Sequence, residues 1–138
     1  MFDIKARIIL ENQEKVLLLL QKTKQGEKYT LIGGRVEEVE YAKEALVREC
    51  YEEVGIRVRS KDLKLVHVLH KKNKRGNVLT LYFQSSYWTG TILNKEPANF
   101  KGVYWFPIKS LPAKTSPTSK HVIDQFLKGK SYSDLDRQ

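Results

Sequence analysis

The 138-residue chain has a single cysteine, no long hydrophobic run and no segment that looks like a leader. Cys50 has no second cysteine with which to form an internal disulfide. The longest apolar run, 16–20, is far shorter than the about 20 residues of a membrane-spanning helix. The opening segment MFDIKARIIL lacks the basic and apolar regions of a signal peptide. We therefore expect a cytoplasmic protein with no membrane partner.

The sequence also lacks internal repeats, low-complexity tracts and linkers. Its length is about the modal size of one domain. Hydrophobic residues make up 41% and charged residues 30%, a composition typical of folded proteins rather than disordered ones. We therefore expect a single domain over residues 1–138.

Acidic residues are scarce relative to basic ones: 16 Asp and Glu stand against 25 Lys and Arg, a formal net charge of +9. Such a charge favours polyanionic partners, namely nucleotides, nucleic acid or acidic membrane surfaces. An ordinary solvated surface explains the same charge, so the charge by itself selects no function.

The pattern of apolar residues and turn residues predicts strands before and after one strong helix. The helix covers 41–54 and is followed by Gly55, a residue that commonly ends helices. A basic connection, 71–76, reads as a hairpin loop, and the polar tail from Lys128 is expected to fray. Strands are predicted at 2–10, 15–21, 29–32, 62–70, 78–88 and 103–106, with a second helix at 119–127. This arrangement indicates an α/β fold around a mixed sheet.

Three glutamates share one face of the predicted helix. Glu49, Glu52 and Glu53 are spaced i, i+3 and i+4, while the apolar stripe that would pack on the sheet lies on another face. Like charges at this spacing repel, and a divalent cation such as Mg²⁺, which prefers oxygen ligands, reverses the sign of that interaction. The alternative is a solvated helix end in which Arg48 pairs with Glu44 or Glu52.

The wider pattern favours the metal site. From Gly34, five residues lead to Glu40 and seven more lead to Arg48, after which the chain reads ECYEEVGI. This segment, 34–56, resembles the Nudix box, Gly-x5-Glu-x7-Arg-Glu-U-x-Glu-Glu-x-Gly-U with U apolar, at every defined position. The chain is therefore identified as a member of the Nudix hydrolase family.

The resemblance implies an α/β/α sandwich with a mixed sheet and a loop-helix-loop motif that holds Mg²⁺ or Mn²⁺. Family members hydrolyse nucleoside diphosphates linked to another moiety. By resemblance, Glu49, Glu52 and Glu53 are metal ligands or the base, and the Gly33 carbonyl is a further ligand. Arg48 orients the glutamates, and Glu40 supports the loop before the helix.

The C-terminal half resembles small bacterial MutT-like Nudix proteins, through NKEP at 94–97, VYWFPI at 103–108 and Leu111-Pro112. Family members often take an extra ligand or base from a loop in this region, which makes Glu96 a candidate catalytic residue. A surface glutamate is the alternative. Ile32 stands where many members have proline. Residues 71–74 carry neither the proline linked with ADP-ribose enzymes nor the tyrosine linked with dinucleoside polyphosphate enzymes.

The expected activity is metal-dependent cleavage of a nucleoside triphosphate to monophosphate and pyrophosphate. ADP-ribose-like nucleotide sugars and RNA 5′ ends are the alternatives within the family. A non-catalytic nucleotide or RNA sensor, or a module that only binds nucleic acid, are alternatives from other classes. The sequence leaves a homodimer open.

Overall fold

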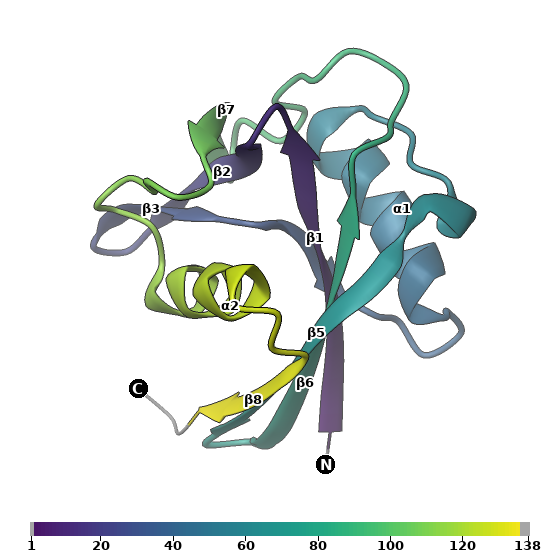
Figure 1. The fold of residues 1–138 in the computed structure, drawn as a ribbon, viewed down its shortest axis with the longest axis vertical. Coiled ribbons are helices and arrows are strands. Elements are labelled where there is room, and N and C mark those ends of the chain that lie inside the picture. Colours follow the sequence, from purple (N-terminus) through teal and green to yellow (C-terminus); the bar gives the residue numbers. More distant parts are fainter. Residues whose placement is uncertain (1, 136–138) are drawn as a thin grey trace.

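Strands make up most of the regular structure (Figure 1). The computed structural model describes residues 2–135. In chain order the elements are β1 (Phe2–Asn12), β2 (Lys15–Thr23), β3 (Gly26–Thr30), β4 (Ile32–Arg35), α1 (Ala42–Val54), the short 3-10 turn η1 (Ser60–Asp62), β5 (Lys64–Asn73), β6 (Gly76–Ser85), β7 (Phe100–Pro107), α2 (Pro117–Leu127) and β8 (Tyr132–Leu135).

β1 is the strand on which the sheet is assembled. Residues 2–10 pair in parallel with β6, residues 5–8 pair antiparallel with β4, and residues 11–12 pair antiparallel with β2. The strand order is β3-β2-β1-β6-β5-β8, with β4 added on β1 and β7 added on β2. The sheet is therefore mixed, and the expected α/β fold class is confirmed.

The two helices cover different faces of this sheet (Figure 1). The apolar run of β2 shows how the strands serve both layers: Leu17 and Leu19 join the core on the α1 side, while Val16 and Leu18 join the core on the α2 side. A strand buried on both faces needs apolar residues at consecutive positions. The expected sandwich of helix, sheet and helix is confirmed. Neither helix of the described residues has the length and apolarity needed to cross a bilayer.

Several predicted boundaries were wrong. Gly33 and Gly34 do not end a strand but lie inside β4, where they pair with β1. The basic residues 71–73 belong to β5, so the hairpin turn is shorter than expected. α2 begins at Pro117 rather than Ser119, because Ser116 caps its first turn and proline suits the first helical positions.

The polar tail was expected to fray, and for residues 132–135 this was wrong. These residues form β8, which runs parallel to β5. The buried His67 anchors it: the Lys130 carbonyl accepts from Nδ1 at 2.8 Å, so Nε2 accepts from the Ser133 hydroxyl at 2.7 Å. The Ser133 oxygen in turn accepts from Nε2 of His121, on α2, at 2.9 Å. Residues 136–138 of the predicted tail lie outside the described residues.

Candidate active site

The catalytic candidates sit on α1 because its ends and its apolar face hold it against β4. The Tyr41 N–H donates to the Glu44 carboxylate at 2.9 Å at the start, and Gly55 closes the end with φ 74°. Leu46, Cys50 and Val54 are fully buried in the core on this side, as expected for the packed stripe. Glu49, Glu52 and Glu53 therefore emerge beside the Gly33-Gly34 segment.

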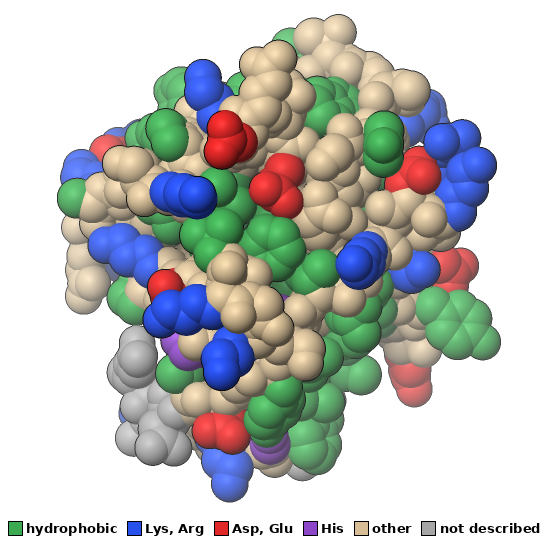
Figure 2. Space-filling view, viewed as in Figure 1, with side chains coloured by type: hydrophobic (Ala, Val, Ile, Leu, Met, Phe, Trp, Pro, Cys, Tyr) green, Lys and Arg blue, Asp and Glu red, His purple; other side chains and the backbone are tan. Residues whose placement is uncertain are grey.

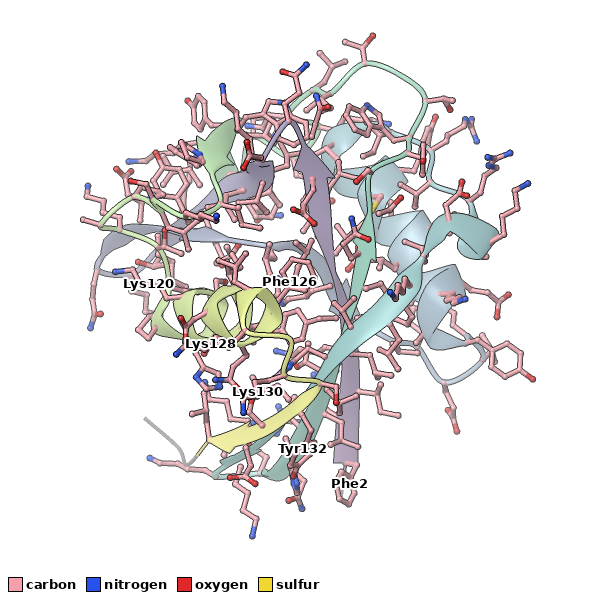
Figure 3. The ribbon with its side chains drawn as sticks, in the orientation of Figure 1. Phe2, Lys120, Phe126, Lys128, Lys130 and Tyr132 are labelled. Atoms are coloured by element: carbon pink, nitrogen blue, oxygen red, sulfur yellow. The ribbon has the colours of Figure 1, made fainter. Side chains whose placement is uncertain are left out.

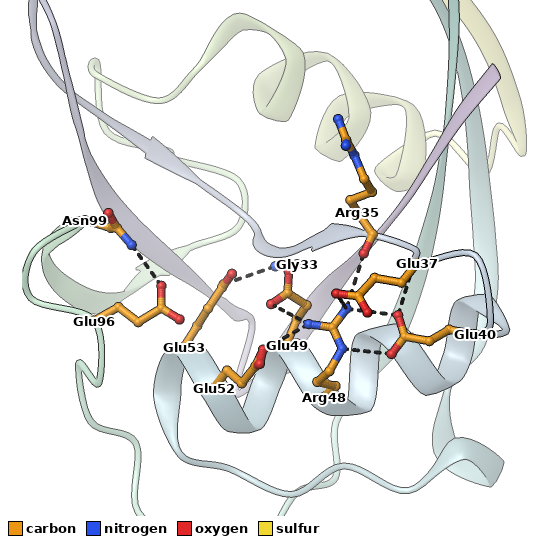
Figure 4. Close-up of polar contacts among 10 residues, drawn as sticks. All are labelled: Gly33, Arg35, Glu37, Glu40, Arg48, Glu49, Glu52, Glu53, Glu96 and Asn99. Atoms are coloured by element: carbon orange, nitrogen blue, oxygen red, sulfur yellow. Dashed lines mark hydrogen bonds and ion pairs between the residues drawn. The ribbon is translucent and has the colours of Figure 1, made fainter. Parts of the chain in front are cut away.

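Arg48 forms hydrogen bonds with three carboxylates of the site (Figure 4). Its Nε and Nη2 donate to the two oxygens of Glu40 at 2.8 and 3.0 Å. Its Nη1 donates to Glu52 at 2.9 Å and to Glu49 at 3.4 Å. The Arg48 guanidinium, helped by the Glu37 N–H, lowers the pKa of Glu40 to about 2. The planar donor fork thus links Glu40 to two of the predicted metal ligands.

Glu53 lies in a different environment. Only 6% of it is exposed, and its Oε1 accepts from the Gly33 N–H at 3.3 Å. Burial, followed by the charge of Glu49, raises its pKa to about 8, against the opposing effects of the Gly33 hydrogen bond and Arg7. Glu53 is thus largely buried because α1 packs closely on β4, although it belongs to neither apolar core.

Glu49 occupies space that only glycine leaves free. A Cβ on Gly34 would overlap the Glu49 carboxylate, and a Cβ on Gly33, whose φ is +146°, would overlap the Ala6 carbonyl on β1. Both glycines therefore let strand and helix approach closely. Burial raises the pKa of Glu49, while Arg48 lowers it and Glu52 and Glu96 raise it further.

The loop before β7 carries Glu96 to the end of α1. The Lys95 N–H donates to the Glu53 carbonyl at 3.0 Å, which extends the helix terminus into the loop. The Asn99 side chain donates to the Glu96 carboxylate at 3.1 Å (Figure 4). Glu96 and Glu53 consequently line one cavity of about 310 Å³, together with Gly33 and Arg7. We call this the acidic cavity.

The structure divides the predicted site residues into two groups. Glu53, Glu96 and Gly33 line the acidic cavity, whereas Glu49 and Glu52 are engaged by Arg48 and do not line it. Sequence reasoning missed Arg7, whose Nη1 donates to the Leu31 carbonyl at 2.6 Å at the cavity wall. The sequence held a signal for it, because Arg7 is a charged residue within an apolar strand, where charged side chains are rare unless they are paired.

The oxygen donors suit a hard divalent cation. Within residues 2–135, no group of three or more His, Cys, Asp or Glu side chains is already arranged as a metal site. The donors nearby are nevertheless carboxylates, and the Glu49 charge raises the pKa of buried Glu53. Neither carboxylate of the acidic cavity forms a salt bridge among the described residues. A cation there would relieve the repulsion that burial enforces, so the residues present fit Mg²⁺ or Mn²⁺.

Known proteins share this architecture. A MutT NUDIX hydrolase from Burkholderia pseudomallei superposes with a TM-score of 0.82 at 20% identity, over 91% of this chain and 98% of that chain. A MutT protein from Bacillus halodurans superposes with a TM-score of 0.79 at 20% identity, over 99% of this chain and 90% of that chain. These likenesses establish the fold.

A relative in sequence is a Methanocaldococcus jannaschii protein named ADP-ribose pyrophosphatase. It is 29% identical over 124 residues, which span 89% of this chain and 72% of the relative. The NUDIX domain family model matches residues 1–126, well over half of the chain. With the two glycines in place on β4 and with Arg48 and the three glutamates that follow it in place on α1, the chain belongs to the Nudix hydrolase family of pyrophosphate-cleaving enzymes.

Proposed function

We propose that this chain is a Mg²⁺-dependent pyrophosphohydrolase that cleaves a nucleoside triphosphate or another nucleoside diphosphate derivative. The observation that carries the proposal is Glu53, a carboxyl that is 6% exposed and forms no salt bridge among the described residues. A buried carboxyl without a cation is costly, and a metal ligand role explains why it is kept. The proposal treats residues 1–138 as one cytoplasmic domain.

In this proposal Glu49, Glu52, Glu53 and the Gly33 carbonyl hold the metal. When bound, the metal screens the charge of the phosphates and lowers the pKa of a water that attacks phosphorus. Arg48 holds Glu49 and Glu52 on one side of the site. Glu96, oriented by Asn99, lines the same cavity as Glu53 and is a further ligand or proton acceptor.

Glu52 is the box glutamate that would turn most easily toward a metal. Its side chain is 43% exposed and its contact to Arg48 is a single 2.9 Å ion pair, so moving it toward a metal costs little. Arg48 remains fixed by its two hydrogen bonds to Glu40. Glu52 would therefore join Glu49 and Glu53 as a ligand while Arg48 stays bound to Glu40.

The test is release of pyrophosphate and phosphate from a panel of nucleotides with Mg²⁺, Mn²⁺ or EDTA. The parent protein is compared with Glu52→Gln and with Glu38→Gln, a matched change at an exposed position of the same motif. Metal-dependent release that Glu52→Gln abolishes and Glu38→Gln retains supports the proposal. No metal-dependent release from any nucleotide in the panel contradicts it and favours the sensor or the nucleic-acid module.

ADP-ribose is the second candidate substrate, because the Methanocaldococcus jannaschii relative carries that name. The same panel includes ADP-ribose, with AMP and ribose 5-phosphate separated by chromatography. Turnover of ADP-ribose above that of every nucleoside triphosphate would move the assignment to nucleotide sugars. A 5′-triphosphorylated RNA in the panel tests the remaining alternative.

A further inference from the structure

A second cavity adjoins the acidic one and differs from it in its charged residues, because the acidic cavity is lined by Glu53 and Glu96 as well as by Arg7 and Lys22. Its volume is about 440 Å³, and it shares Arg7, Gln21 and Thr30 with the acidic cavity, so the two lie side by side with a common wall. Five cationic side chains line it, and no Asp or Glu does: Lys5, Arg7, Lys28, Lys71 and Lys72. We call it the basic cavity.

The cations of the basic cavity are not held in salt bridges among residues 2–135. None of the five forms a salt bridge within the part of the chain that the structure describes. The Lys71 ammonium instead donates to the Thr118 hydroxyl at 3.0 Å. Lys5 is half-buried, and burial, followed by the charges of Arg7 and Arg35, lowers its pKa. Cations brought together in this way repel unless an anion joins them.

The α2 helix adds to the positive potential. Residues 116–119, at its N-terminal end, line the same cavity, and its first turn contains no acidic residue. Ser116 caps the helix by accepting from the Ser119 N–H at 3.1 Å. The N-terminal end of a helix attracts anions through its dipole and free N–H groups.

This cluster differs from the general surface charge. Figure 2 shows Lys and Arg side chains spread over the face that carries α2 rather than gathered in one patch. Lys120, Lys128 and Lys130 are exposed around α2 (Figure 3). Lys5, Arg7 and Lys71, by contrast, are partly buried in one cavity. The excess of basic residues alone does not explain why these three converge.

The register of β1 shows how the two cavities follow one another along this strand. Arg7 pairs with Gly33, next to the carboxylates, and Lys5 pairs with Arg35 and with Thr80 of β6. Residues two apart on a strand point to the same face, about 7 Å apart. Lys5 therefore lies farther from Glu53 along β1 than Arg7 does.

We propose that the basic cavity binds a second phosphate of the substrate, esterified outside the diphosphate that is cut. This inference rests on the proposed function, because it takes the acidic cavity as the place of cleavage. The preferred substrate class is then a nucleotide that carries a further phosphate ester, rather than a plain nucleoside triphosphate. A phosphomonoester on the ribose and the first phosphodiester of an RNA 5′ end supply the same chemistry.

The first test measures binding without turnover. In EDTA, calorimetry compares adenosine 3′,5′-bisphosphate with adenosine 5′-monophosphate, and the pair is repeated with guanosine. We expect the bisphosphate to bind at least about tenfold more tightly, because charge-assisted hydrogen bonds contribute that much or more. Equal dissociation constants for the two probes with both bases would overturn the proposal, whatever the protein hydrolyses.

Variants locate the binding. The double change Lys5→Gln and Lys71→Gln should remove the preference for the bisphosphate, and Lys71→Arg, which keeps the charge, should retain it. Lys64→Gln is the matched control, since Lys64 lies on the same strand as Lys71 but outside the cavity. A preference that survives the double change would also overturn the proposal. Thermal unfolding in EDTA checks that each variant is folded.

The second test separates the two sources of phosphate. With Mg²⁺, kcat/KM is compared for a 5′-triphosphorylated dinucleotide, the nucleoside 5′-triphosphate and its 3′-phosphorylated form. Preference for the dinucleotide assigns the cavity to an RNA phosphodiester, and preference for the 3′-phosphorylated form assigns it to a monoester. Absence of all turnover contradicts the proposed function, whereas the binding test in EDTA still decides this inference.

Discussion

The acidic and basic cavities share Arg7, but like charges of opposite sign are brought together in them: carboxylates in the first and cations in the second. In the acidic cavity a buried carboxyl stands near other carboxylates, and its pKa rises to about 8. In the basic cavity, cations stand together and the pKa of Lys5 falls. Each cavity disfavours the charge it carries, and each is therefore relieved by a ligand of the opposite sign. A substrate with a metal-bound diphosphate and a further anionic group would supply a cation to one cavity and an anion to the other.

The difference also shows that net charge is a poor guide to a site. The chain carries +9 overall, but its carboxylates are concentrated around α1 and the cavity beside it. A uniformly basic surface would attract polyanions without orienting them. Adjoining cavities of opposite sign would orient a bound nucleotide, with its metal-binding diphosphate at one end.

The largest expected effect comes from removing the charge of the acidic cavity. Glu53→Gln should lower kcat of the metal-dependent reaction by about 10³-fold, because a neutral amide replaces the most deeply buried carboxylate of the metal site. Steady-state kinetics at saturating Mg²⁺ measures this, with Glu38→Gln as control. Activity within tenfold of the parent would show that Glu53 has a structural role only, and that the acidic cavity does not depend on it for catalysis.

Ionised Glu53 should favour activity but lower the free energy of unfolding. In the unfolded chain the Glu53 carboxyl ionises near 4.5, whereas in the folded protein its pKa is about 8. As pH rises through this interval the unfolded state loses a proton that the folded state keeps, so the free energy of unfolding falls. The loss from Glu53 should reach about 4 kcal/mol by pH 8 without metal.

Urea denaturation in EDTA at pH 5 and pH 8 measures this loss. Glu53→Gln should be more stable than the parent at pH 8 and close to it at pH 5, because the amide does not ionise. Mg²⁺ should narrow the difference at pH 8 by stabilising the parent alone. A variant less stable than the parent at pH 8 in EDTA would contradict the raised pKa.

Arg48 tests whether the acidic residues depend on one orienting cation. Arg48→Gln leaves Glu40 without the donors that hold it at 2.8 and 3.0 Å, and frees Glu49 and Glu52. We expect a 10- to 100-fold loss of activity, roughly the range for residues that orient metal ligands. Arg48→Lys should recover little of it, because an ammonium cannot pair bidentately.

The expected loss should appear mainly as a higher Mg²⁺ concentration for half-maximal activity. Arg59→Gln, which removes an exposed ion pair to Asp62, is the control and should leave the Mg²⁺ dependence unchanged. An unchanged Mg²⁺ dependence in Arg48→Gln would mean that Arg48 supports the fold rather than the ligands.

The smallest expected effect lies at the wall of the basic cavity. Ser116→Ala removes the cap of α2 and should lower the free energy of unfolding by about 1 kcal/mol. Ser116→Asp should keep the cap but bring a negative charge to the cavity. Chemical denaturation and binding of adenosine 3′,5′-bisphosphate separate the two roles. Equal bisphosphate affinity in the two variants would show that the charge of this wall does not matter.

Local patterns predicted the parts of the fold that depend on neighbours in sequence. The helix around Glu49, its apolar stripe with Cys50 and its end at Gly55 follow from spacing within one segment, and the structure confirms them. The apolar run 16–20 predicted a strand, and its continuity matches the burial of both faces of that strand. The polar residues of 132–135 gave no such signal, because β8 is held by pairing with β5 and by His67.

The sequence by itself determined that the chain is a Nudix protein and which glutamates lie on one helix, since both depend on short, regular spacing. Only the tertiary structure decided that Glu53 is buried under Gly33, that a distant loop brings Glu96 beside it, and that Lys5 and Lys71 converge. These relations arise from strand register and helix packing between segments far apart in the chain. The pKa of a carboxyl or an ammonium follows from that assembled environment, which no local pattern specifies.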